Sequence, residues 1–206
     1  RQAVGTAGVT FTFRNEEEGK FTKTDYCYPN GILDYVNEIA GEQTLTMPQF
    51  WQAERKGRDR EDKPEYKVKI NTALCFSNRH TLKEYYHNSS WLEYGGVPEK
   101  ATRSAFVSQI DAYIKQSGKY KSNESKITFS DIEECLVLVI SSFSTVTSYE
   151  NQTKKAINNP FICDALNNFL RKQLEIYFIE NHDAAEKIAA QVLINKRSRE
   201  NAEKTR

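Results

Sequence analysis

Residues 66–76, which read Tyr-Lys-Val-Lys-Ile-Asn-Thr-Ala-Leu-Cys-Phe, decide the fold class of this 206-residue chain. Apolar residues alternate with Lys67 and Lys69, and the side chains of a strand alternate between its two faces, so this pattern predicts a strand with one buried face. Residues 50–54 precede it across a charged loop at 57–65. Because such a loop stays in solvent and joins neighbouring strands, we expect the two stretches to pair antiparallel.

A second expected strand, residues 135–140, reads Cys-Leu-Val-Leu-Val-Ile and is apolar on both faces, which is typical of the centre of a sheet. Apolar residues at helical spacing predict helices over 32–39, from Pro98 up to a glycine stop, and from Pro160 onward. Residues 77–97 show no periodicity and contain several Asn, Ser and Gly residues, so we expect a long loop. The expected core includes Phe106, Ile110, Val137, Val139, Leu166 and Leu170.

Both ends of the chain are expected to extend from this core. Residues 9–13 alternate in polarity and 20–28 follow a turn, so a hairpin is predicted at the start. At the other end Asp183, with Glu186 three residues later as a capping box, is expected to open a helix that runs to the end. The chain begins with Arg1 rather than Met and stops inside that helix, so we expect an excised fragment.

Composition limits the classes of partner. Twenty-nine Lys and Arg against 28 Asp and Glu give a net charge of +1, so a contact with DNA would have to be local. The longest apolar run has six residues, whereas about 20 span a bilayer, and no membrane partner is expected. The length suffices for one sizeable domain with an appendage.

The chain contains no complete catalytic or metal motif. Its four cysteines form no Cys-x-x-Cys pair and no Cys/His pair at metal-ligand spacing, so we expect buried thiols, no metal site and a reducing, cytoplasmic compartment. His80, His87 and His182 lack a paired carboxylate or cysteine, and we interpret them as polar surface histidines.

One polar segment, residues 148–154, stands apart because it follows the apolar strand and precedes the Pro160 helix. The ammonium of Lys154 is a compact charge suited to a terminal phosphate, and the amide of Gln152 would add a neutral donor. On chemistry alone, a solvated loop lysine is the simpler interpretation.

Two further segments allow two interpretations each. Gly95-Gly96 before a helix could cradle an anion, but it lacks the spacing of phosphate-binding loops and is more simply a flexible turn. In the basic C-terminal segment, Lys196, Arg197 and Arg199 could contact a DNA backbone, or could simply suit the helix dipole.

Taken in order, these segments resemble the transducer domain of type IIA DNA topoisomerases, the family of the gyrase B protein and its topoisomerase IV counterpart. The resemblance covers nearly the whole chain. It rests on the hairpin and the Gly31 helix, the strand ending in Phe76-Ser77-Asn78, the Gly95-Gly96 pair, Gln152-Thr153-Lys154, and the helix at 195–206.

This resemblance implies an α+β fold like the second domain of ribosomal protein S-five. That fold has a sheet with helices on one face and a left-handed βαβ crossover, here followed by a long C-terminal helix. Residues 1–182 would form the transducer domain, including the hairpin and helix that lead from an ATPase domain. Residues 183–206 would lead toward a metal-binding toprim domain.

The resemblance also implies a function. Lys154 would contact the terminal phosphate of ATP in a neighbouring pocket, with Gln152 and Thr153 beside it, and would couple ATP hydrolysis to dimer closure and DNA strand passage. ATP and Mg²⁺ would be cofactors of the intact isomerase, and this chain alone is predicted to be inactive. Double-stranded DNA, a second copy of the same protein and a gyrase A-like DNA-cleaving protein are the implied partners.

Three points stay open from the sequence. The family usually continues its Gly-Gly segment with Thr-His, whereas this chain has Val97-Pro98, which puts a contact role for the glycines in doubt. Gyrase and topoisomerase IV are not distinguished. The alternatives are a stand-alone nucleic-acid- or protein-binding module of the same fold and, less well matched, the transducer of a mismatch-repair ATPase.

Overall fold

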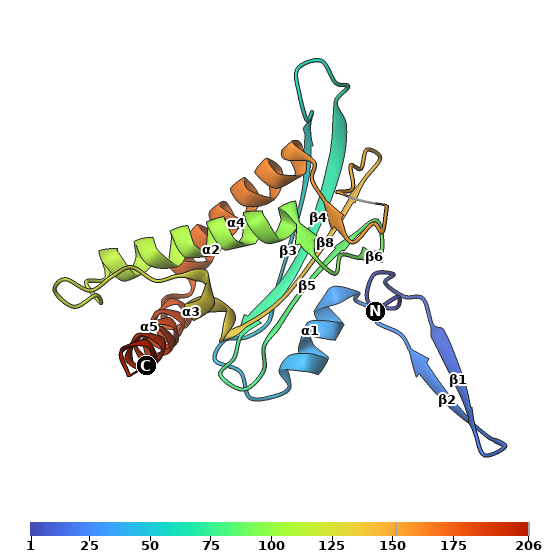
Figure 1. Cartoon of the computed structure of the whole chain (residues 1–206), viewed down its shortest axis with the longest axis horizontal. Coiled ribbons are helices and arrows are strands. Elements are labelled where there is room, and N and C mark those ends of the chain that lie inside the picture. The colour runs from blue at the N-terminus through green and yellow to red at the C-terminus, as the bar shows by residue number, and fades with distance from the viewer. Residues whose placement is uncertain (151, 206) are drawn as a thin grey trace.

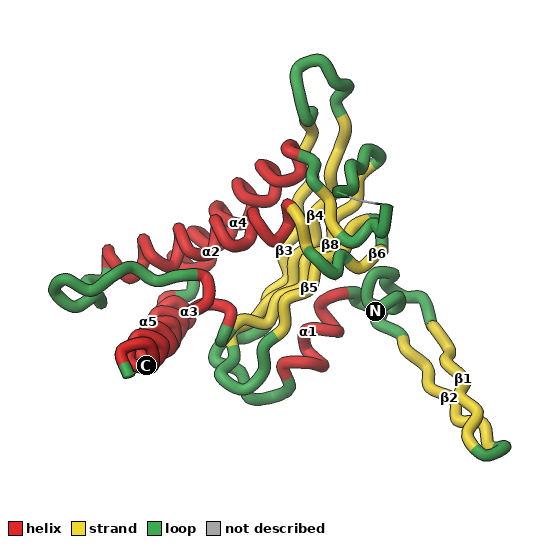
Figure 2. Tube along the Cα trace, viewed as in Figure 1, coloured by secondary structure: helices red, strands yellow, loops and turns green. Residues whose placement is uncertain are grey.

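A five-stranded mixed sheet forms the centre of the computed structural model, which describes residues 1–150 and 152–205 (Figures 1 and 2). In spatial order the strands are β3 (Gln49–Gly57), β4 (Tyr66–Phe76), β8 (Leu136–Ser144), β5 (Leu82–His87) and β6 (Ser90–Trp91). Strand β4 pairs antiparallel with both β3 and β8, and β5 runs parallel to β8. The antiparallel pairing of β3 with β4 confirms the prediction made from residues 50–76.

Strand β8 lies in the middle of the sheet and is buried on both faces, as its apolar sequence predicts. Leu138 and Ile140 belong to the larger apolar cluster on one face. Val137 and Val139 belong to a second cluster on the other face. A strand covered on both sides has no face left for polar side chains, which explains why its first five residues are all apolar.

Helices cover both faces of the sheet (Figure 1). The helices are α1 (Ile32–Ala40), α2 (Val97–Gln116), α3 (Phe129–Glu133), α4 (Pro160–Glu180) and α5 (His182–Lys204). Phe106 and Ile110 of α2 and Leu166 and Leu170 of α4 are buried in the larger cluster, which confirms the expected core. Helix α1 packs on the opposite face, against β4 and β8, and so departs from the expectation of helices on one face. The fold is α+β with a long C-terminal helix, as expected.

The prediction of a long loop at 77–97 is wrong, because this stretch contains β5, β6 and the short strand β7 (Gly95–Gly96). The pattern of β5 was hidden by polar residues that are buried. Glu84 is buried and accepts a hydrogen bond of 2.6 Å from the hydroxyl of Tyr86. His87 at the end of the strand is also buried. Polar residues that are satisfied internally break the alternation that a sequence pattern relies on.

Helix α5 runs from His182 to Lys204, as expected, but the predicted capping box at Asp183 is wrong. The N-cap residue is Asn181, and no described side chain caps the helix. The Glu186 carboxylate instead accepts hydrogen bonds from Tyr113 and Lys119 of the neighbouring α2 region.

The N-terminal hairpin is present as predicted, with β1 (Phe11–Glu17) antiparallel to β2 (Lys20–Tyr26). It projects away from the sheet (Figure 1), and Phe13 and Phe21 are 61% and 72% exposed. Cys27 directly after it is exposed too, and Cys163 is only partly buried, so the expectation of four buried thiols holds for Cys75 and Cys135 alone.

Helix α4 supplies a test of the core. Replacing the fully buried Leu166 by Ala should lower the free energy of unfolding by about 2–5 kcal/mol, because it removes apolar contacts and leaves a cavity. Ile179→Ala in the same helix is the matched control, since Ile179 is 76% exposed, and should change it by less than about 0.5 kcal/mol. Urea denaturation measures both. Equal effects of the two substitutions would contradict this packing.

Candidate functional site

The residues Gln152, Thr153 and Lys154 lie near the tip of a loop between β8 and the short strand β9 (Ala156–Ile157), and all three are exposed. Tyr149 forms an antiparallel bridge with β9, and the amide of Glu150 donates a hydrogen bond of 3.0 Å to the carbonyl of Ala156. The segment is therefore a hairpin with a closed stem and an exposed tip. Asn151 lies outside the described residues.

Lys154 and its neighbour Lys155 have different environments. Lys155 forms an ion pair with Glu93, and the hydrogen bond that Lys155 donates to this carboxylate raises the pKa of Lys155. Lys154 forms no ion pair with any described carboxylate, and its Nζ atom lies 5.9 Å from the centre of the Tyr149 ring. Its backbone has a φ of 56°, which is uncommon outside glycine. Lys154 thus presents a cation at the tip, while Lys155 fixes the loop to the fold.

Gly95 and Gly96 pack against β9, the short strand that directly follows this loop. They form β7, which pairs parallel with β9. A Cβ atom on Gly96 would lie 2.2 Å from the carbonyl oxygen of Ile157, so only glycine permits this approach. The amides of Gly95 and Gly96 donate to carbonyls of Leu92 and Tyr94. The pair is therefore a packing site for β9, and neither the flexible turn nor the anion cradle considered from the sequence describes it.

The interpretation of all three histidines as surface residues is wrong for His87, which is fully buried. Its Nδ1 atom lies 2.8 Å from Oγ of Ser142 in β8, and its Nε2 atom lies 2.9 Å from Oγ1 of Thr147 in the loop stem. Burial lowers the pKa of His87 to about 4, so the ring is neutral near pH 7. His80 and His182 are exposed, as expected.

This burial predicts a pH dependence of stability. The unfolded chain takes up a proton on His87 near pH 6.5, whereas the folded chain does so only near pH 4, so the free energy of unfolding should fall by about 3 kcal/mol as the pH drops through this window. Urea denaturation at pH 7 and at pH 4, for the wild type and His87→Gln, measures this contribution. The variant should lose less stability over the window, and an identical loss would contradict the assignment.

The basic C-terminal residues lie in internal ion pairs. The Nζ atom of Lys196 lies 3.1 Å from Oε1 of Glu124, and Arg197 contacts the same carboxylate at 2.9 Å. The guanidinium of Arg197 is the main cause that lowers the pKa of Glu124 to about 2. Arg199 contacts the buried Asp131 at 2.8 Å. The side chain of Lys196 has no exposed surface, so it is unavailable to a DNA backbone in this conformation.

These ion pairs predict a structural role for Lys196. Lys196→Ala should lower the free energy of unfolding by about 3 kcal/mol, because it leaves the carboxylates of Glu124 and Glu200 without their buried partner. Lys187→Ala, at an exposed position of the same helix, is the control and should cost less than about 0.5 kcal/mol. Thermal unfolding compares the two. A near-neutral Lys196→Ala would instead favour a free, surface-contacting lysine.

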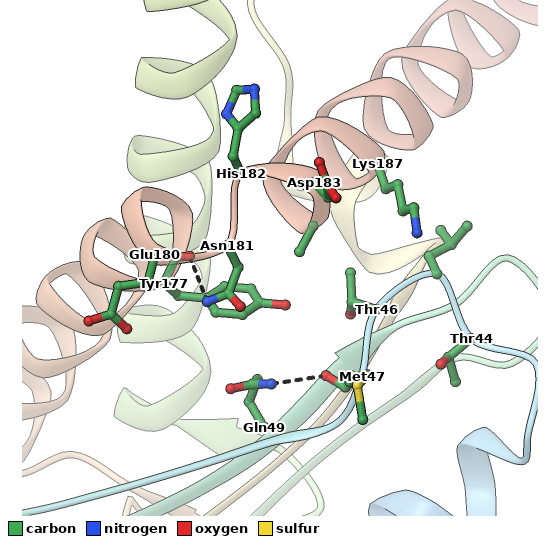
Figure 3. Close-up of a pocket in the computed structure, with 12 residues that line it drawn as sticks. Thr44, Thr46, Met47, Gln49, Tyr177, Glu180, Asn181, His182, Asp183 and Lys187 are labelled. Carbon is green, nitrogen blue, oxygen red and sulfur yellow. Dashed lines mark hydrogen bonds between the residues drawn. The ribbon is translucent and has the colours of Figure 1, made fainter.

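The pocket in Figure 3 lies at the junction of α4 and α5 and is lined by Asn181, His182 and Lys187 together with the loop that carries Thr46 and Met47. The loop with Lys154 is at the other end of α4, and a helix of this length spans about 30 Å. The pocket is thus separate from the loop. Among residues 1–150 and 152–205, no three His, Cys, Asp or Glu side chains cluster as metal ligands, and no helix is long and apolar enough to cross a bilayer.

Comparisons with known proteins identify the family. A family model described as DNA gyrase B matches residues 31–206. The chain belongs to the DNA gyrase B family. The DNA gyrase B protein of Metamycoplasma arthritidis is 30% identical over 186 residues, which cover 89% of this chain and 29% of that protein. The gyrase B protein of Mycoplasmoides gallisepticum is 27% identical over 199 residues, which cover 95% of this chain and 31% of that protein.

Solved structures show the same fold in this family. The 43K ATPase domain of Thermus thermophilus gyrase B, in complex with an aminocoumarin, superposes with a TM-score of 0.70 at 20% identity, covering 98% of this chain and 52% of that one. The topoisomerase IV ATP-binding domain of Francisella tularensis gives 0.69 at 18% identity, covering 96% of this chain and 51% of that one. The gyrase B-like chain described here spans about a third or less of the curated relatives it matches. The resemblance to the gyrase B family that the sequence indicates is confirmed.

Proposed function

We propose that this chain is the transducer part of an ATP-dependent type IIA topoisomerase and that Lys154 contacts the terminal phosphate of ATP held by a neighbouring domain. One observation carries the proposal: Lys154 is exposed at the tip of a hairpin whose stem and neighbouring Lys155 are fixed to the fold. Gln152 and Thr153 at the same tip would assist. Residues 1–182 would form this transducer, and 183–206 would lead on toward the next domain.

The side chains of Lys154 and Gln152 suit contact with the phosphate groups of a nucleotide. An exposed ammonium and an exposed amide are suitable donors to phosphate oxygens. Under the proposal, the groups that bind Mg²⁺ and the base of ATP would come from another part of the full-length protein. For that reason the chain alone should neither bind ATP tightly nor hydrolyse it, since one cation and one amide cannot offset the entropy of capturing a nucleotide.

The mechanism follows from differential binding. ATP supplies a terminal phosphate that ADP lacks, so Lys154 would interact with the two nucleotide states unequally. That inequality favours one arrangement of the transducer relative to the nucleotide-binding domain. When the phosphate leaves, Lys154 loses its anion and the arrangement is released. In a dimer of the full-length protein, this change would open and close a passage for double-stranded DNA.

The remaining partners belong to the same proposal: a second copy of the full-length protein, a gyrase A-like DNA-cleaving protein, and DNA in the cytoplasm. Any DNA contact at the end of α5 would fall to Arg197 and Arg199, whose side chains are 35% and 27% exposed. The buried Lys196 would stabilise this part of the helix through its ion pairs with Glu124 and Glu200. The alternative is a binding module of the same fold with no ATP role, in which Lys154 would be dispensable.

Lys154→Ala in the full-length protein distinguishes the proposed ATP-contacting transducer from the binding module with no ATP role. A charge-assisted contact to phosphate in a closed pocket contributes about 1.5–3 kcal/mol, so ATP turnover should fall by about one to two orders of magnitude. Gln152→Ala should have a smaller effect, because a neutral donor contributes less than a cation. Steady-state ATPase and strand-passage assays measure both variants.

The melting temperature is the control for this experiment. Lys154 is exposed, so its truncation should change the free energy of unfolding by less than about 0.5 kcal/mol. Lys172→Ala, which removes an exposed lysine of α4, should leave ATP turnover unchanged. Wild-type ATPase in Lys154→Ala would overturn the proposed role and favour the binding module.

A further inference from the structure

Two fully buried polar side chains hold the stem of the Lys154 loop. His87, at the end of β5, has Nε2 2.9 Å from Oγ1 of Thr147. Asn159, directly before α4, accepts a hydrogen bond of 2.7 Å at its Oδ1 atom from the amide of Ser148. Thr147 and Ser148 are consecutive, so two elements far apart in the sequence hold neighbouring residues of one stem.

His87 and Asn159 each form a further hydrogen bond, on the side away from the stem, with a residue of the central sheet or its loops. The Nδ1 atom of His87 lies 2.8 Å from Oγ of Ser142, which ties the histidine to the central strand β8. The Nδ2 atom of Asn159 donates a hydrogen bond of 2.9 Å to Oδ2 of Asp59, in the loop between β3 and β4. The stem is thereby connected to the middle of the sheet on one side and to the β3–β4 hairpin on the other.

The choice of residue types indicates what these contacts do. Burying an imidazole or an amide costs free energy that an apolar side chain would not cost, unless its polar atoms are hydrogen-bonded. His87 and Asn159 recover this cost through bonds that end on the loop stem. Their contribution beyond packing is therefore to fix where the stem leaves the sheet.

We infer that His87 is a positioning residue for Lys154 that acts through Thr147, with Asn159 as a second hold on the same stem. This inference rests on the proposed function of Lys154. Lys154 lies beyond the bridge between Tyr149 and Ile157 of β9. A small rotation of the stem therefore displaces the Lys154 ammonium by more than it displaces the stem itself. A productive contact tolerates a displacement of only about 0.5 Å.

Thr147→Val in the full-length protein tests this inference, because it removes the hydroxyl while keeping the shape of the side chain. Thr147 is only partly buried, so the substitution opens no core cavity. The substitution removes the hydrogen bonds of this hydroxyl with Nε2 of His87 and Nδ2 of Asn88. We therefore expect ATP turnover to fall at least about fivefold, with the KM for ATP within about twofold. Thr147→Ser keeps the hydroxyl and should restore turnover.

Thr145→Val is the matched control, since Thr145 lies two residues earlier, is exposed and forms no hydrogen bond with any described residue. It should leave turnover unchanged. The melting temperatures of all three variants should stay close to that of the wild type.

The double variant Thr147→Val/Lys154→Ala decides between positioning and a general structural role. If His87 and Thr147 act through Lys154, the double variant should be no slower than Lys154→Ala alone. Independent, multiplying losses would overturn the inference, as would wild-type turnover in Thr147→Val. If Lys154→Ala itself kept wild-type turnover, the proposed function would fail and the inference with it, which is a distinct and recognisable outcome.

Discussion

The fold depends on burying β8 on both faces at once. Helices α2 and α4 cover one face, and α1 covers the other. Strand β8 also forms backbone ladders with β4 on one edge and β5 on the other, so its position is fixed in every direction. The loop that carries Lys154 begins where this strand ends. A strand held this firmly is the least mobile base from which a loop can extend.

Buried polar groups add specificity to this apolar frame. His87, Asn159 and Lys196 are each fully buried, and each contacts a partner from a different element. Apolar packing tolerates many similar arrangements, whereas a buried hydrogen bond or ion pair is satisfied in only one. These three residues therefore define how the loops and α5 are placed on the sheet. Two of them, His87 and Asn159, act at the stem of the Lys154 loop.

The strongly periodic elements could be predicted from sequence, because their side chains meet only a core or solvent. The strand at 66–76, the apolar β8 and the helices after Pro98 and Pro160 are of this kind. Strand β5 could not be predicted, because Glu84 and His87 are satisfied by hydrogen bonds that the sequence pattern does not reveal. The same limit applies to the candidate site. Gln152-Thr153-Lys154 could be found from the resemblance to a family. The residues that His87 contacts, and the Glu124 partner of Lys196, lie 55 or more residues away in the chain.

A fixed stem also determines how strongly Lys154 could act as a sensor. A loop that must be ordered on contact spends part of its interaction energy on lost conformational freedom. The stem at Thr147 and Ser148 is already ordered by His87 and Asn159, so less of the phosphate contact is lost in this way. A net difference of about 1.4 kcal/mol between nucleotide states changes a two-state equilibrium tenfold. Under the proposed function, His87 and Asn159 therefore leave more of the interaction free energy between Lys154 and the phosphate available to favour one arrangement of the domains.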